Sequence, residues 1–154
     1  MKTLLVSLVA LVAFVCLAQA EKPNLDAGSL HKLSTHVVTG EVVTIYQRPE
    51  RSGGWSWSKY LAEVRVATCE KGEGLSGGDL VYVRYWQRHK WIGPGPMPAG
   101  TNGHRGLPAE GETLRIYLAR NAYDGFHTAE QNHDGGFNVI GANGFERLPE
   151  PKDQ

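Results

Sequence analysis

The sequence predicts an all-β protein of five to six short strands, closed or nearly closed into a small barrel with long loops. Several runs alternate apolar and polar residues with a period of two, which is typical of half-buried strands. The 19 glycines and 8 prolines disfavour long helices. At 154 residues the chain has the length of one domain, and closing a short sheet removes its unpaired edges. A β-sandwich is the alternative.

The first strand is expected between Thr35 and Tyr46, after a polar lead over residues 21–34. This stretch is dense in β-branched residues, which favour extended backbone. Its one glycine, Gly40, stands at the centre, where it predicts a bend or bulge in the strand.

The next two strands are expected to form a hairpin. Alternation is clean from Tyr60 to Val66 and again from Leu80 to Trp86, and the glycine-rich residues 71–79 between them predict a turn. One face of this hairpin should be buried, and it carries the following residues: Tyr60, Ala62, Val64, Val66, Val81, Val83 and Tyr85.

A long loop is expected over residues 87–111, because it is rich in glycine and proline and has no apolar period. A fourth strand follows at residues 114–118, and a second loop at residues 121–135. Short strands are then expected at residues 136–140 and from Phe145, where Asn143 and Gly144 supply a turn pair.

The first 20 residues have the three parts of a secretory signal: a positive Lys2, an apolar run from Leu4 to Leu17, and the small-residue cleavage site Ala18-Gln19-Ala20. The apolar run is shorter than the ~20 residues that span a bilayer. We therefore expect a secreted or periplasmic protein without a membrane span after cleavage. A single β-domain over residues 35–148 and a flexible tail over residues 149–154 complete the organisation.

The bulk charge gives no support to a nucleic-acid partner, because 16 Lys and Arg residues balance 16 Asp and Glu residues. Cleavage would also remove Cys16, which leaves Cys69 as the mature chain's one cysteine. No intramolecular disulfide is then expected, and a lone cysteine is most often buried.

The order of strands and loops resembles an OB-type barrel in which a loop replaces the helix between strands three and four. More narrowly, the sequence resembles exported bacterial proteins of the netrin-like and metalloproteinase-inhibitor-like family over about residues 35–120. The segments that carry this resemblance are Val38-Thr39-Gly40-Glu41-Val42, Val64-Arg65-Val66 running to Lys71-Gly72, and Val81-Tyr82-Val83. Inhibitory members of that family chelate a target's metal through an N-terminal cysteine. Here the expected mature N-terminus is Glu21, so inhibition by that route is not expected.

Aromatic residues in two loops are the leading ligand-binding candidates. Trp55 and Trp57 lie in the polar segment Gly53 to Ser58, where no local pattern buries both, and Tyr123 and Phe126 lie in the second long loop. Indole faces stack on sugar rings and bases, and OB-type barrels bind oligosaccharides through such loops. The competing interpretation is that both tryptophans fold back as a lid over the barrel mouth.

The outward face of the third strand is a second candidate, since Tyr82, Arg84 and Trp86 alternate aromatic and cationic groups there, followed by Arg88. Stacking combined with charge can hold an acidic glycan or a single-stranded polyanion. The alternative is that the loop over residues 87–111 covers this face.

A metal site is the third candidate. His127 and His133 lie near acidic residues and would suit Zn or Cu, although their spacing matches no recognised motif. Solvated polar loops are the simpler interpretation, and no cofactor is otherwise implied. The chain contains no Gly-x-Ser-x-Gly elbow, no His-Glu-x-x-His motif and no phosphate-binding glycine loop.

These observations together favour an exported, noncatalytic binding module. It would recognise a glycan, a peptide or a protein partner through aromatic end loops. The alternative is a metal-binding protein or a small metal-dependent hydrolase that uses the loop histidines.

Overall fold

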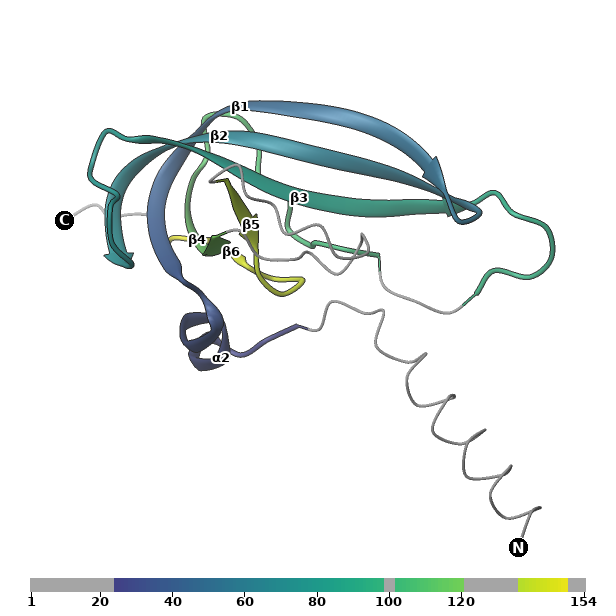
Figure 1. Ribbon diagram of the computed structural model, residues 1–154, viewed down its shortest axis with the longest axis horizontal. Coiled ribbons are helices and arrows are strands. Elements are labelled where there is room, and N and C mark those ends of the chain that lie inside the picture. The colour runs from purple at the N-terminus through teal and green to yellow at the C-terminus, as the bar shows by residue number, and fades with distance from the viewer. Residues whose placement is uncertain (1–23, 99–101, 121–135, 150–154) are drawn as a thin grey trace, which may run out of the picture.

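The computed structural model of this protein describes residues 24–98, 102–120 and 136–149 (Figure 1). The expected signal peptide over residues 1–20 lies outside these ranges. So do the second-loop candidates: Tyr123, Phe126, His127 and His133. Within the described ranges, no helix is both long enough and apolar enough to cross a bilayer.

Six strands of the described chain form one mixed sheet, so the two-sheet sandwich is not what is found. They are β1 (His36–Ser52), β2 (Trp55–Lys71), β3 (Leu80–Trp91), β4 (Thr113–Arg120), β5 (Phe137–Val139) and β6 (Phe145–Arg147). The order is β1-β2-β3-β5-β4-β6, and β4 also pairs with β1, so the hydrogen bonding nearly closes into a ring. The β3–β5 pair is parallel and all other pairs are antiparallel.

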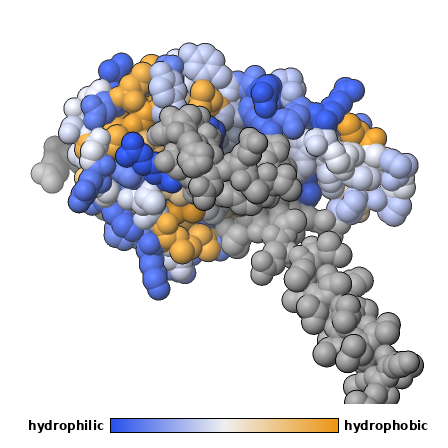
Figure 2. Space-filling model, in the orientation of Figure 1, coloured by the Kyte–Doolittle hydropathy of each residue, from blue (hydrophilic) through white to orange (hydrophobic). Residues whose placement is uncertain are grey.

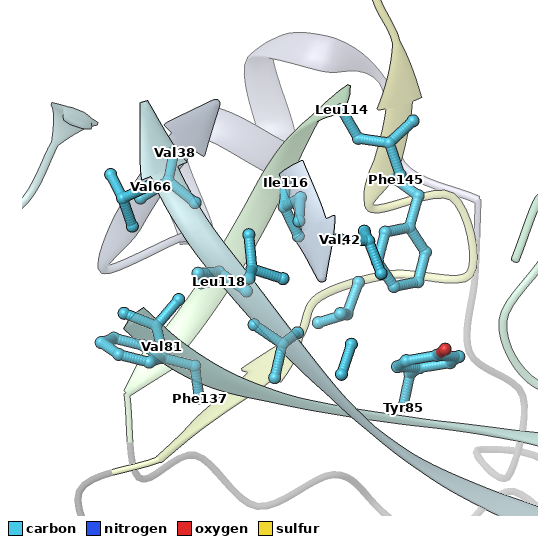
Figure 3. Packing of buried hydrophobic residues seen from close by; sticks show 14 residues of the cluster. Val38, Val42, Val66, Val81, Tyr85, Leu114, Ile116, Leu118, Phe137 and Phe145 are labelled. Atoms are coloured by element: carbon cyan, nitrogen blue, oxygen red, sulfur yellow. The ribbon is translucent and has the colours of Figure 1, made fainter. Parts of the chain in front are cut away.

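The core lies inside this ring and is built from the alternating residues predicted from the sequence (Figure 3). The predicted inward face of the hairpin is confirmed, because Ala62, Val64 and Val83 are fully buried. The following residues complete the cluster: Val38, Val42, Val66, Val81, Tyr85, Leu114, Ile116, Leu118, Phe137, Val139 and Phe145. Burial of this apolar surface is the main stabilising contribution to the ring.

Gly40 lies where β1 is hydrogen-bonded on both sides, opposite Val66 of β2 and Leu114 of β4. The β1–β2 register shifts between Thr39 and Gly40, which agrees with the expected bend. A Cβ at position 40 would lie 2.6 Å from the carbonyl oxygen of Arg65. Only glycine allows β2 to approach this closely.

The first three strands are longer than the sequence predicts, and they extend beyond the ring as a three-stranded ribbon (Figure 1). We define the ribbon as residues 46–52 of β1, 55–60 of β2 and 86–91 of β3. The expected loop from Gly53 to Ser58 is therefore wrong. Only Gly53 and Gly54 turn, both with positive φ, and the strand resumes at Trp55. The expected loop over residues 87–111 is wrong in its first five residues, which continue β3.

The polar lead contains a short helix that was not predicted, α2 (Ala27–Leu33). Asp26 caps its N-terminus by accepting hydrogen bonds from the backbone N–H and the hydroxyl of Ser29, which lower the pKa of the Asp26 carboxyl. Lys71 binds the far end of the helix, where its ammonium donates to the carbonyl of His31. Leu30 packs on Val37 and Tyr117 and fixes the helix against the sheet.

Candidate functional site

The predicted ligand-binding residues of β2 and β3 meet on one face of the sheet. Pairing places Trp57 opposite Arg88 and Leu61 opposite Arg84, and Trp86 and Tyr82 alternate with these arginines along β3. Residues directly opposite each other in an antiparallel pair share a face. Two separate predictions, the tryptophan pair and the outward phase of the third strand, therefore describe one surface.

All four tryptophans of the chain gather at the ribbon. The ring of Trp55 lies 5.1 Å from that of Trp91 and 6.5 Å from that of Trp57, between centroids. The Arg88 guanidinium lies 3.8 Å from the centroid of Trp55 and 5.7 Å from that of Trp57. These contacts combine apolar burial with cation–π attraction and make a small second core outside the ring.

Trp55 and Trp86 are the buried members of this group of four tryptophans. Trp55 is 8% exposed and Trp86 is 3% exposed. Residues 102–104 cover Trp86: His104 packs on it at 5.7 Å between ring centroids, and the backbone of Gly103 lies against its ring. The interpretation that the long loop covers the third strand is confirmed at this position. Burial leaves little of either ring accessible to a ligand. Both rings instead pack against Trp57.

Trp57 is half-buried and forms the wall of a hollow of about 480 Å³. Its indole N–H donates to the carbonyl of Ser52 at 3.1 Å, and its ring packs edge-on against Trp86 at 5.6 Å. These contacts fix the orientation of the ring before any ligand arrives. The other residues that line the hollow are Pro49, Glu50, Arg51, Ser56, Ser58 and His89.

Two of these lining residues, Ser58 and His89, belong to a hydrogen-bonded group of three side chains. The side-chain amide of Gln47 donates to the Ser58 hydroxyl at 2.8 Å, and Nε2 of His89 lies 2.7 Å from the same oxygen. The Ser58 hydroxyl has one proton and two lone pairs, so it can bond to Gln47 and His89 at the same time. The group sets the position of the His89 ring at the wall of the hollow.

The charge at the hollow is mixed. Glu50 pairs with Lys59 at 2.8 Å and with Arg48 at 3.4 Å. Arg51 also lines the hollow. In Figure 2 the ribbon end is mainly hydrophilic with a small hydrophobic area, whereas larger hydrophobic areas lie at the other end of the molecule.

The predicted metal site falls on residues 127 and 133, outside the described ranges. Among residues 24–98, 102–120 and 136–149, no group of three His, Cys, Asp or Glu side chains is placed to hold an ion. Cys69 is half-buried, and its thiol donates to the carbonyl of Lys71 at 3.1 Å.

Two further histidines, His36 and His104, are buried and lie within hydrogen-bond distance of backbone groups. His36 is buried, with Nε2 3.1 Å from the carbonyl of Glu73. His104 is fully buried, and its Nδ1 accepts from the backbone N–H of Trp86 while Nε2 lies 3.1 Å from the carbonyl of Val139.

Sequence reasoning found Trp57 but missed the polar residues around it. Gln47 and Glu50 lie beyond the expected end of the first strand, and His89 lies in the expected loop over residues 87–111. They come together through the pairing of β1, β2 and β3. The chain matches no protein-family model, no curated protein and no solved structure. Its own geometry is therefore the basis for interpreting the site.

Proposed function

We propose that this protein is an exported, noncatalytic module of the OB type that binds a glycan in the hollow beside Trp57. The ring order supports the fold assignment, since an OB barrel is a five-stranded, partly open Greek-key barrel. Barrels of this type bind oligosaccharides on the face of strands two and three and at the adjoining loops. The hollow beside Trp57 lies at the end of the β1–β2 hairpin.

The composition of the hollow carries the proposal. One indole forms a flat apolar wall, and the remaining lining includes a carboxylate, a guanidinium, two hydroxyls and an imidazole. A sugar ring offers the matching pair of surfaces, with apolar C–H groups on its face and hydroxyls at its edge. Trp57 and Pro49 supply the apolar part of this lining, and the charged and hydroxyl groups surround it.

The rigidity of Trp57 favours stacking. Its N–H is held by Ser52, and Trp86 packs against the ring. A ring that is already fixed loses little side-chain entropy when a ligand binds, so more of the stacking energy appears as affinity. Stacking of a nucleobase on an aromatic side chain contributes about 1–3 kcal/mol, and we take the lower end of this range for the face of a sugar.

Titration of the mature protein with soluble oligosaccharides of glucose and of N-acetylglucosamine tests this function, followed by indole fluorescence and calorimetry. We expect quenching on binding, and Trp57→Ala should weaken binding at least about tenfold, the equivalent of 1.4 kcal/mol. Tyr46→Ala is the matched control, because Tyr46 is an exposed aromatic residue of β1 outside the hollow.

Either of two results would refute the function. One is that no oligosaccharide binds, and the other is that binding is unchanged in Trp57→Ala.

A further inference from the structure

We propose that the tip of the ribbon docks on an anionic lipid bilayer, with exposed apolar side chains entering the lipid and neighbouring cations lying at the headgroups. We define the tip as residues 53–54, between β1 and β2, together with residues 92–98, which directly follow β3. This inference goes beyond glycan binding and does not depend on it.

The tip is the end of the ribbon that lies farthest from the ring (Figure 1). There β3 runs to the right-hand end of the molecule, and the loop that follows it projects beyond the turn between β1 and β2. A flat surface that meets the ribbon end-on therefore touches this loop before it touches the ring.

Apolar side chains are exposed at the tip. Ile92 is 47% exposed, and Met97 is 67% exposed, the largest value among the exposed large hydrophobic residues of the described chain. The stretch from Trp91 to Pro98 contains no charged side chain and no hydroxyl group. Figure 2 shows a small hydrophobic area at this end of the molecule. Exposed apolar surface of this kind, bordered by polar residues, is typical of membrane and protein interaction sites.

Polar contacts fix the loop that carries these side chains. The backbone N–H groups of Ile92 and Gly93 donate to the carbonyl of Gly54 at 2.8 and 3.0 Å. The indole N–H of Trp91 donates to the carbonyl of Gly95 at 3.1 Å. Gly93 lies against the same indole, since a Cβ there would be 2.5 Å from the ring. The apolar tip is therefore formed in advance, so docking costs little additional ordering.

The ribbon next to the tip has an excess of positive charge. The whole chain balances 16 Lys and Arg residues with 16 Asp and Glu residues. The ribbon has one acidic residue, Glu50, and its cations are Arg48, Arg51, Lys59, Arg88 and Lys90. Glu50 is shared between Arg48 and Lys59. Among the described side chains, no carboxylate forms an ion pair with Arg51 or Lys90. Anionic lipid headgroups attract cations placed in this way.

The small size of the tip favours a bilayer over a protein partner. A stable protein interface takes about 800 Å² from each partner and a surface of matching shape. The exposed apolar part of the tip consists mainly of the Ile92 and Met97 side chains. A bilayer requires no matching surface, because apolar groups enter the acyl boundary while the cations stay with the lipid phosphates.

Flotation of the mature protein with lipid vesicles tests the docking. The probes are vesicles of phosphatidylcholine alone and vesicles in which about one third of the lipid is phosphatidylglycerol. Neither lipid carries a sugar, so the outcome does not depend on the glycan proposal. We expect binding to the mixed vesicles, binding at least about tenfold weaker to phosphatidylcholine alone, and progressive release as salt is raised.

Indole fluorescence reports which end of the protein docks, because all four tryptophans of the chain lie in the ribbon. Trp91 directly precedes Ile92 at the tip. Brominated acyl chains quench indoles that lie at the acyl boundary. We expect vesicles of brominated lipid to quench the emission of the bound protein, and they would not do so if the ring end docked.

The double variant Ile92→Ser with Met97→Ser should weaken binding to the mixed vesicles at least about tenfold, because it removes the apolar groups that enter the lipid. The matched control is Leu33→Ser with Leu80→Ser, which removes two side chains that are 57% and 42% exposed outside the ribbon. This control should bind as the parent protein does. All four side chains are exposed, so neither variant should change the melting temperature by more than a few degrees.

A second pair of variants tests the charge. Arg48→Gln with Lys90→Gln should weaken binding to the mixed vesicles and reduce its dependence on salt. The matched control is Lys32→Gln with Arg65→Gln, which removes two exposed cations outside the ribbon. None of these four residues lines the hollow beside Trp57.

The proposal is overturned if the protein floats with neither kind of vesicle, as expected of a tip that serves a protein partner, or if it binds both kinds equally. It is also overturned if the bound protein is not quenched, or if either control weakens binding as much as its tip or ribbon counterpart. Oligosaccharide binding is measured without vesicles, so the two proposals fail independently.

Discussion

Replacing Trp55 by alanine should open the ribbon and leave the ring folded. Trp55 is buried, but its ring contacts are Trp57, Trp91 and Arg88, none of which belongs to the core cluster inside the ring. The substitution should therefore lower mainly the free energy of local unfolding of the ribbon.

The magnitude follows from those contacts. Truncating a buried tryptophan to alanine costs about 3–5 kcal/mol, and the cation–π contact with Arg88 accounts for about 0.5–2 kcal/mol of such a loss. Because each 1.4 kcal/mol is tenfold in an equilibrium constant, local opening should become at least about a hundredfold more frequent.

Native-state hydrogen exchange measures this difference residue by residue. The reporter at the tip of the ribbon is the amide of Ile92, the residue directly after β3, which bonds to the carbonyl of Gly54 in the β1–β2 turn at 2.8 Å. The reporters in the ring are Val64 and Val66, which are fully buried. Exchange should accelerate at Ile92 and remain within about threefold of its original rate at the two valines.

Uniform acceleration at all three amides would refute the reasoning, because it would mean that the tryptophan cluster and the ring unfold as one unit. Tyr46→Ala removes an exposed ring from β1 and should leave all three rates unchanged.

Three other changes test the ring and its cover. Gly40→Ala should lower the free energy of unfolding in urea by about 1–3 kcal/mol, since the new Cβ would press on the backbone of Arg65; an unchanged midpoint would contradict the close approach. His104→Ala should cost about 2–4 kcal/mol by the same assay, because two buried backbone partners lose their hydrogen bonds, and an increase in the accessibility of the Trp86 indole to acrylamide should accompany it. Burial raises the pKa of the Tyr85 phenol, so the unfolded chain loses this proton first as pH rises. The free energy of unfolding should then fall as pH rises above the ordinary value of 10.0, and Tyr85→Phe should flatten that dependence.

The ring could be predicted from the sequence because the buried residues of its strands are apolar and recur at every second position. Val64, Val83 and Ile116 each stand in a run with period two, and all three are fully buried. The ribbon could not be predicted in this way. Its first strand contains Gln47, Arg48 and Pro49, which have no apolar period, and it is a strand because β2 pairs with it over its whole length.

The candidate site could be predicted only in part, because some of its residues are recognisable by type and others meet only through strand pairing. Trp57 stands out by residue type, so the sequence alone singles it out. Ser58 and His89 are 31 positions apart and meet through the β2–β3 register, which shifts between Ser56 and Trp57. A register shift of this kind leaves no mark in the composition of either strand. The helix was missed for a related reason: its cap, Asp26 with Ser29, is present in the sequence, but seven residues are too few for a clear apolar stripe.

The ribbon also bears on how this protein behaves when it is concentrated. Beyond Ile45, whose N–H bonds to the Glu110 carboxylate, the described part of β1 pairs with β2 alone, so the ribbon part of β1 is an edge of the sheet. Free edges of this length invite intermolecular pairing and aggregation. Here Pro49 has no N–H to donate, and the adjacent Arg48, Glu50 and Arg51 place charge beside it. Proline and charge both oppose the pairing of edge strands, so replacing Pro49 and its charged neighbours by valine or threonine should increase aggregation relative to the natural sequence.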